Sequence, residues 1–132
     1  MRAIAILTAL CLSLPAGALP MAPAQRSSCD NPTSDFDNVY CERKVYMQAD
    51  SELNTAYAKL RAKLGPADRT AVLRSQRAWI RERDGACNRT DDENIKIDLV
   101  CAKRMTIDRT NWLNDRLREC SSSGCRSSRL RD

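Results

Sequence analysis

The sequence predicts an all-α fold: a disulfide-stapled antiparallel helical hairpin or three-helix bundle. Apolar residues recur at spacings of three and four over much of residues 34–117, which is the period of a helix that is buried on one side. Gly65-Pro66 interrupts this pattern with a helix stop followed by a helix start. Six cysteines follow residue 28, an even number that is typical of a disulfide framework in a short chain. We find no strand pattern and no repeat.

The N-terminal segment has the features of a secretory signal peptide. Arg2 precedes a short apolar run over residues 4–14. Small residues at 16–18 and 22–24 form possible signal-peptidase sites, with cleavage after Ala18 or Ala24. The run is too short to span a bilayer. We therefore expect residues 1–24 to be removed, and residues 25–132 to form a single helical domain with a short basic C-terminal tail, periplasmic or secreted.

The first two helices are delimited by recognisable end signals. Thr33 or Ser34 is the expected N-cap of a helix over about residues 34–64, because acidic residues follow in its first turn. Pro66 then begins a second helix over about residues 66–87, since proline is favoured at the first helical position. The short joint between them predicts that the two helices are antiparallel neighbours.

A third helix is expected to open at Thr90-Asp91-Asp92-Glu93, which resembles a capping box. Its apolar positions include Ile95, Leu99 and Leu113, and its pattern fades near Cys120. We expect the Ser- and Arg-rich residues beyond Cys120 to be a loop and a frayed terminus.

Residues 76–84, QRAWIRERD, place polar side chains on a face that should face the core, because Gln76 and Arg83 share helical spacing with Leu73 and Ile80. Residues equally far from the Gly65-Pro66 turn should face each other, which pairs Asn54 with Gln76 and Asp50 with Arg83. A buried arginine is tolerated when it pairs with a carboxylate. We therefore predict a structural polar lock of Asp50, Asn54, Gln76 and Arg83. The alternative interpretation is a ligand site.

The six cysteines allow fifteen pairings. Cys41 lies about 100° of helical rotation from the face that meets the second helix, which disfavours a Cys41–Cys87 bond. We favour three local closures, Cys29–Cys41, Cys87–Cys101 and Cys120–Cys125.

Two motifs carry a family resemblance. A-D-x-x-L-N-x-x-Y over residues 49–57, followed by Q-R-A-W-I-x-x-R-D-x-x-C over residues 76–87, resembles the lysozyme inhibitor LprI-like N-terminal domain family. The likeness covers about residues 29–117 and includes Cys29, Cys41, Cys101, Thr106, Arg109 and Leu113. It implies a small exported helical domain that binds and inhibits lysozyme. The chain departs from a lipoprotein relative, because Leu10 rather than a small residue precedes Cys11.

The composition argues against catalysis. The chain has no histidine and no CxxC motif, so it lacks the commonest metal ligand and general base and the thioredoxin-type redox motif. We expect no enzymatic activity, no cofactor and no bound metal, and in an exported protein we expect no nucleic acid partner.

Charge is distributed unevenly, and it suggests where a partner could bind. Loss of Arg2 leaves 21 basic against 17 acidic residues, a net charge of +4. Residues 29–54 carry six acids and two bases, whereas residues 55–90 carry nine bases and three acids. Two tips and one helix face are the candidate binding residues: Arg61 and Lys63 beside the Gly65-Pro66 turn, Arg89 and Thr90 braced by Cys87–Cys101, and a basic ridge of Arg74, Arg77 and Arg81.

The expected function is therefore a non-enzymatic, lysozyme-inhibitor-like protein-binding domain, with lysozyme or another envelope protein as its partner. The alternative is an envelope binding module whose basic ridge engages an anionic glycan, a lipid or an acidic protein.

Overall fold

The computed structural model describes residues 28–91 and 94–131. The predicted signal peptide lies outside these residues. The described chain contains a 3₁₀ turn η1 (Ser28–Asp30), the helices α1 (Asp35–Lys63), α2 (Pro66–Cys87) and α3 (Leu99–Ser122), the strands β1 (Asn88–Asp91) and β2 (Asn94–Ile97), and a 3₁₀ turn η2 (Ser127–Leu130). Within the described ranges, no helix is long and apolar enough to cross a membrane.

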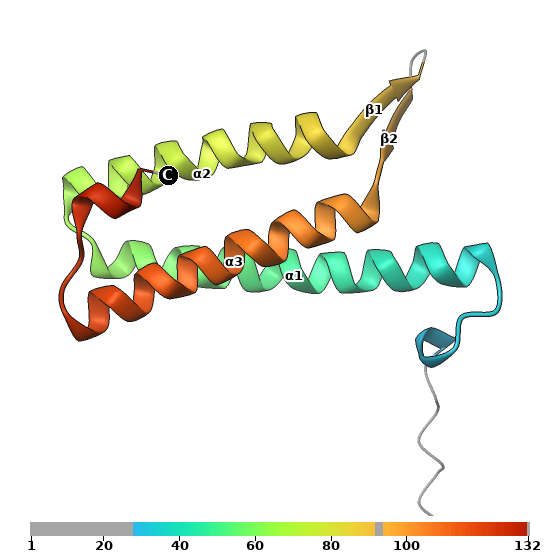
Figure 1. Ribbon diagram of the computed structural model, residues 1–132, viewed down its shortest axis with the longest axis horizontal. Helices are drawn as coiled ribbons and strands as arrows, with labels where there is room; N and C mark the ends of the chain where they lie inside the picture. The colour runs from blue at the N-terminus through green and yellow to red at the C-terminus, as the bar shows by residue number, and fades with distance from the viewer. Residues whose placement is uncertain (1–27, 92–93, 132) are drawn as a thin grey trace, which may run out of the picture.

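The three helices form an elongated bundle in which α1 and α3 run in the same direction and α2 runs antiparallel to both (Figure 1). The closest helix contact joins α1 to α3, although these helices are far apart in the sequence. Small buried residues line both sides of this contact and let the backbones approach closely. They are Ala49 and Ala56 in α1 and Ala102, Thr106 and Thr110 in α3.

The hydrophobic core lies at the end of the bundle where α1 turns into α2. Its largest buried side chains are aliphatic, and Trp79 closes the cluster on the side of α3. Toward the start of α1 the core ends at Leu53, because the next buried residue in that direction is the small Ala49. Its members are Leu53, Ala56, Leu60, Leu64, Val72, Trp79, Leu113 and Leu130.

The start of α1 carries a double cap. The Ser34 hydroxyl accepts a hydrogen bond from the Asp37 N–H (3.1 Å) and donates one to the Asp37 carboxylate (2.9 Å), which also accepts from the Thr33 N–H (3.3 Å). These hydrogen bonds favour the ionised carboxylate, so they lower the pKa of Asp37 below its ordinary value. Ser34 is one of the two predicted N-caps.

The prediction that a helix opens at Thr90 is wrong. Thr90 and Asp91 lie in β1, Ile95 lies in β2, and α3 begins only at Leu99. The effective cap is Asp98, whose carboxylate accepts a hydrogen bond from the Cys101 N–H at 2.9 Å. Asp92 and Glu93, the other half of the predicted capping box, lie outside the described residues.

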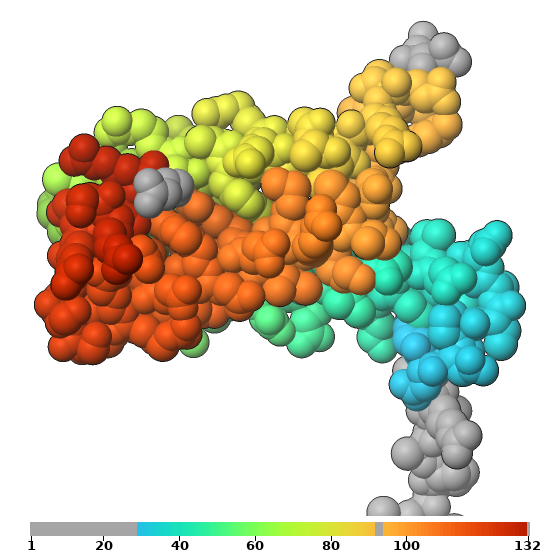
Figure 2. All heavy atoms as spheres, in the orientation of Figure 1, coloured from blue at the N-terminus to red at the C-terminus, as the bar shows by residue number. Residues whose placement is uncertain are grey.

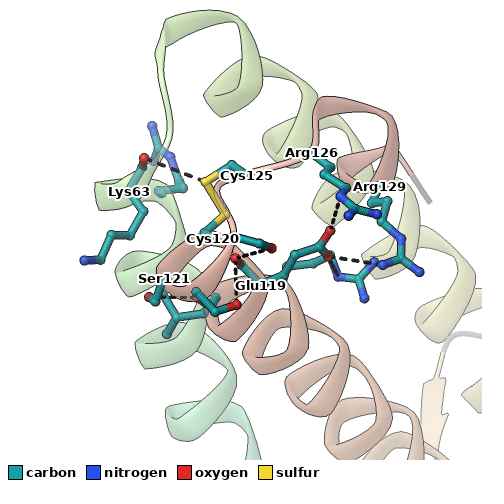
Figure 3. The surroundings of a disulfide bond; sticks show 12 residues. Lys63, Glu119, Cys120, Ser121, Cys125, Arg126 and Arg129 are labelled. Carbon is teal, nitrogen blue, oxygen red and sulfur yellow. Dashed lines mark hydrogen bonds and ion pairs between the residues drawn. A yellow bond between two sulfur atoms is a disulfide. The ribbon is translucent and has the colours of Figure 1, made fainter.

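The prediction of a frayed end after Cys120 is also wrong. Helix α3 continues to Ser122, and η2 then folds back against α2. Leu130 is only 1% exposed, so its side chain completes the core from the end of the chain. Figure 3 shows how the turn is held: Cys120 is bonded to Cys125, and the Glu119 carboxylate faces Arg126 and Arg129.

The buried face of α2 is rotated from the predicted one. The sequence analysis placed Leu73 and Ile80 in the core, but Ile80 is 37% exposed and Leu73 is only partly buried. The buried residues of α2 are Val72, Ser75, Gln76, Trp79 and Cys87. The reason is that α2 packs mainly against α3 and η2, and far less against its sequence neighbour α1.

Candidate functional site

A two-stranded hairpin projects from the end of the bundle where α2 stops (Figures 1 and 2). The strands β1 and β2 are antiparallel, and Asn88 is level with Ile97, Arg89 with Lys96 and Thr90 with Ile95. Side chains of directly opposed residues lie on the same face of a hairpin. One face therefore carries Arg89 and Lys96, and the other carries Thr90 opposite Ile95 and Asn88 opposite Ile97.

The base of this hairpin is closed covalently. Cys87, which is 2% exposed, is bonded to Cys101 with 5.5 Å between their Cα atoms. The Asp98 N–H donates to the Cys87 carbonyl at 2.8 Å and continues the ladder to the first turn of α3. The hairpin itself is solvated: Ile95 is 69% and Ile97 is 54% exposed. The result is a protruding element on a rigid base.

The hairpin was the main element that the sequence analysis missed. Arg89 and Thr90 were selected as a candidate tip, but Ile95, Lys96 and Ile97 were assigned to a helix. A period-two signal was present, since Thr90, Ile95 and Ile97 are β-branched residues that alternate with polar ones. Lys96 Nζ contacts the Asp91 carboxylate at 2.5 Å, which partly offsets the repulsion between Lys96 and Arg89.

The second predicted tip, at the Gly65-Pro66 turn, makes more contacts with the rest of the protein than the hairpin does. The Arg61 guanidinium lies over the Tyr57 ring, 5.6 Å from its centroid, and the Arg61 carbonyl accepts from the Arg69 side chain at 3.0 Å. The Lys63 carbonyl lies next to Cys125 of the C-terminal turn, as Figure 3 shows. The folded C-terminus therefore flanks this turn, whereas the hairpin protrudes.

The three disulfides are Cys29–Cys41, Cys87–Cys101 and Cys120–Cys125, which are the pairs favoured by the sequence analysis. Each joins residues that are close in the chain, at separations of 12, 14 and 5 residues. They brace, in order, the start of α1, the base of the hairpin and the C-terminal turn. The disulfides therefore lie at the ends of the bundle, and only Cys120–Cys125 packs against the core.

The four residues of the predicted polar lock fall into two groups. Asp50 and Arg83 approach to 3.8 Å across the α1–α2 interface, and Asn54 donates to the Asp50 carboxylate at 3.1 Å. Arg83 makes shorter bonds to its neighbour Asp84, at 2.9 and 3.0 Å. The expected Asn54–Gln76 pair is absent from the hydrogen bonds of the described residues, because Gln76 turns to α3.

Gln76 instead serves a buried arginine of α3. The Gln76 carbonyl oxygen accepts from Arg109 Nε at 3.0 Å, and the Ser75 hydroxyl accepts from Arg109 Nη2 at 2.6 Å. The guanidinium is sandwiched by indole rings, 4.0 Å from the Trp112 centroid and 6.0 Å from that of Trp79. Burial lowers the pKa of Arg109 to about 10, so the side chain stays charged at neutral pH.

A shallow groove separates α1 from α2, with a volume of about 310 Å³. Arg83 of α2 has a side chain long enough to cross this groove and approach Asp50 of α1. The hydroxyl of Tyr57, one of its lining residues, is buried without a hydrogen-bond partner among the described residues. Arg77 also lines this groove, so it lies apart from the other two arginines of the predicted basic ridge.

Those two arginines, Arg74 and Arg81, line a larger hollow of about 690 Å³ between α2 and the C-terminal turn. Arg131 joins them from the segment that was expected to be frayed. Three alanines of α2 lie between the arginines, and we call this feature the arginine hollow. Its lining residues are Ala67, Asp68, Ala71, Arg74, Ser75, Ala78, Arg81, Ser127 and Arg131.

Among the described residues, there is no cluster of three metal-ligating side chains. The carboxylates near the hairpin are exposed or paired with cations. The described residues thus form a protrusion with a covalently closed base at one end of the bundle and a concave surface lined by three arginines toward the other.

Comparison with known proteins assigns this architecture to a family. The model of the family described as "Lysozyme inhibitor LprI" matches residues 29–113. An uncharacterized protein of Rhizobium meliloti (strain 1021) is 32% identical over 91 residues, which span 59% of this chain and 63% of that relative. No solved structure gives a significant match.

Proposed function

Because the chain belongs to the lysozyme inhibitor LprI family, we propose that it is an exported, non-enzymatic inhibitor that binds a lysozyme through the β1–β2 hairpin. The observation that carries this proposal is the protruding hairpin with its covalently closed base. A preformed protrusion loses little conformational entropy when it enters a cleft, which favours tight binding. Residues 1–24 would direct export as a signal peptide.

The hairpin supplies the chemistry that such a cleft would accept. A glycosidase of the lysozyme type works with two carboxyl groups on either side of the bond that it cleaves. Arg89 and Lys96 stand opposite each other on one face of the hairpin, where they can reach such acids. Ile95, on the other face, is an exposed apolar anchor. The hairpin would occupy the position of the sugar chain and neutralise the acids.

Long-range electrostatics would not assist this encounter with a basic lysozyme. The chain carries a formal net charge of +5, so like charges would slow association. Physiological salt screens such forces over about 8 Å, which leaves short-range contacts in control. Inhibition through the hairpin should therefore survive high salt.

The test is a cell-wall lysis assay with purified, oxidised protein and an animal-type lysozyme. Saturable inhibition is expected, and reduction of the disulfides should abolish it. Arg89→Gln combined with Lys96→Gln should raise the inhibition constant roughly tenfold or more, as expected for the loss of a buried charged contact. The matched control is Arg104→Gln, which neutralises an exposed arginine of α3.

Two outcomes would count against this assignment. No inhibition at large excess would remove lysozymes of that class as targets. If Arg61→Gln with Lys63→Gln abolished inhibition while the hairpin variant inhibited normally, the contact would be the Gly65-Pro66 turn.

A second candidate function rests on the arginine hollow. We propose as the alternative that Arg74, Arg81 and Arg131 bind an anionic glycan or lipid of the envelope, because these three arginines line one concavity. Sedimentation with vesicles that contain or lack anionic phospholipid tests this. Binding should fall steeply with salt and with Arg74→Gln plus Arg81→Gln, whereas Arg104→Gln should leave it unchanged.

A further inference from the structure

The first half of α1, residues 35–48, is an exposed arm. No residue in it is buried, and the first buried side chain of α1 is Ala49. Figures 1 and 2 show the arm extending beyond the body of the bundle. Four large apolar side chains nevertheless occupy it on one stripe, within about 100° of helical rotation. They are Phe36 (77% exposed), Val39 (58%), Tyr40 (50%) and Met47 (59%).

The arm is held in place although it lacks a core. Cys41 ties it to Cys29, the double cap of Ser34 and Asp37 fixes its first turn, and Glu42 forms an ion pair with Lys103 of α3. A solvated helix end would ordinarily fray. An ordered helix with an apolar stripe that none of the described residues covers is characteristic of an interaction surface.

The charge of the arm indicates the kind of surface that covers it. Its acids lie toward its start: residues 29–42 contain four acids and no base, and Arg43 and Lys44 follow them. Asp37 is engaged in the cap and Glu42 with Lys103, which leaves Asp30 and Asp35 for a partner. A complementary partner must therefore present an apolar floor edged by cations. The arginine hollow has these properties, since Ala67, Ala71 and Ala78 lie among Arg74, Arg81 and Arg131.

The arm cannot reach the hollow of its own molecule, because the arm extends from one end of the bundle and the hollow lies toward the other end, between α2 and η2 (Figure 1). In an antiparallel pair of molecules, however, each arm lies beside the partner's hollow. Such a two-fold arrangement makes the same contact twice and is closed.

We propose that the arm is a self-association surface, and that two copies of this chain pair antiparallel with the arm of each seated in the arginine hollow of the other. Phe36, Tyr40 and Met47 pack against the alanine floor, and the carboxylates of Asp30 and Asp35 pair with the arginines. The hairpin takes no part in this contact, so the proposal is independent of lysozyme inhibition.

Sedimentation velocity of the oxidised protein over the micromolar range tests this directly. We expect a monomer–dimer equilibrium that weakens with salt. Phe36→Ser should raise the dimer dissociation constant roughly tenfold or more, as for the loss of a central aromatic anchor. The matched control is Val45→Ser, because Val45 is 48% exposed on the same arm but about 180° away from Phe36.

Charge reversal makes the test specific to the two surfaces. Asp35→Lys and Arg81→Glu should each lose the dimer, and an equimolar mixture of the two variants should recover both contacts as a heterodimer, one with the charges exchanged and one with the original charges. Recovery also shows that both variants are folded. Variants of Arg89 and Lys96 should dimerise normally.

Three results would overturn the proposal. The first is a monomer at every concentration in low salt. The second is equal weakening by Phe36→Ser and Val45→Ser. The third is a protein that stays monomeric while its arginine hollow binds anionic vesicles, which would assign the hollow to the envelope.

Discussion

The guanidinium carbon of Arg109 lies 4.0 Å from the centroid of the Trp112 ring, and Arg109 Nε donates to Gln76 at 3.0 Å. One buried cation therefore joins α2 to α3 by stacking and hydrogen bonding together. Arg83 extends the arrangement on α2, because its guanidinium lies 5.1 Å from the centroid of the Trp79 ring.

Arg109→Ala should destabilise the fold strongly. It removes the stacked cation, opens a cavity and leaves the Gln76 carbonyl without its arginine donor, for which we expect a loss of about 3–5 kcal/mol in the free energy of unfolding. Arg109→Lys should recover little, because an ammonium has no planar fork. Urea denaturation measures this against Arg104→Ala, an exposed control; equal effects of the two alanine variants would contradict it.

The proposed lock between Asp50 and Arg83 should be weak by comparison. Its charged atoms are 3.8 Å apart, Asp50 is 44% exposed, and Arg83 has shorter bonds to Asp84. A double-mutant cycle with Asp50→Asn and Arg83→Met should give a coupling energy below about 1 kcal/mol. A much larger value would mean that the pair is a principal connection between α1 and α2.

The α1–α3 contact should reject larger side chains. Ala56 is 3% exposed and faces α3, whereas Ala58, two residues on, is exposed. Ala56→Leu should lower the free energy of unfolding by about 1–3 kcal/mol through overpacking. Ala58→Leu is the matched control and should change it by less than about 0.5 kcal/mol. Tolerance of leucine at both positions would show that the helices can separate.

The end of the chain should contribute to stability. Leu130→Ala removes a fully buried side chain and should cost about 2–4 kcal/mol. Thermal or urea unfolding of this variant can be compared with Arg131→Ala, its exposed neighbour. If Leu130→Ala unfolded like the wild type, η2 would not be docked in solution.

The cap of α1 should weaken in acid. Because hydrogen bonds from Ser34 and Thr33 lower the pKa of Asp37 in the folded state, its contribution is present above the ordinary aspartate pKa of 3.8 and is lost as the pH falls through the lowered value. NMR titration of the Ser34 and Asp37 amides should report this transition. Asp37→Asn should abolish it.

The sequence predicted α1 and α2 well because their ends are encoded locally. Ser34 is an N-cap, and Gly65-Pro66 is both a stop and a start. The hairpin was missed because its strands are only four residues long, too short for alternation to outweigh a nearby capping pattern. The capping pattern at Thr90 predicted the start of α3 too early, because the actual N-cap is Asp98.

The candidate site was predicted only in part, for a different reason. Arg89 and Thr90 could be selected because Cys87 and Cys101 enclose them. Arg109 is 33 residues from Gln76, and Arg131 meets Arg74 only because the C-terminus folds back. Such pairings depend on which helices become neighbours in space. Counting residues from the Gly65-Pro66 turn predicted that Gln76 faces α1. The closest helix contact is instead between α1 and α3, and Gln76 faces α3.

The Cys87–Cys101 bond also has a consequence for the fate of the protein among proteases. An exposed hairpin is a preferred site of cleavage, and the bond spans both of its strands. A molecule cut once between these cysteines stays in one piece, gains only the mass of a water, and separates into two chains only under reducing conditions. The disulfide keeps α2 and α3 linked beside the cleaved peptide bond, so a nicked molecule can keep its fold although its hairpin has been cut.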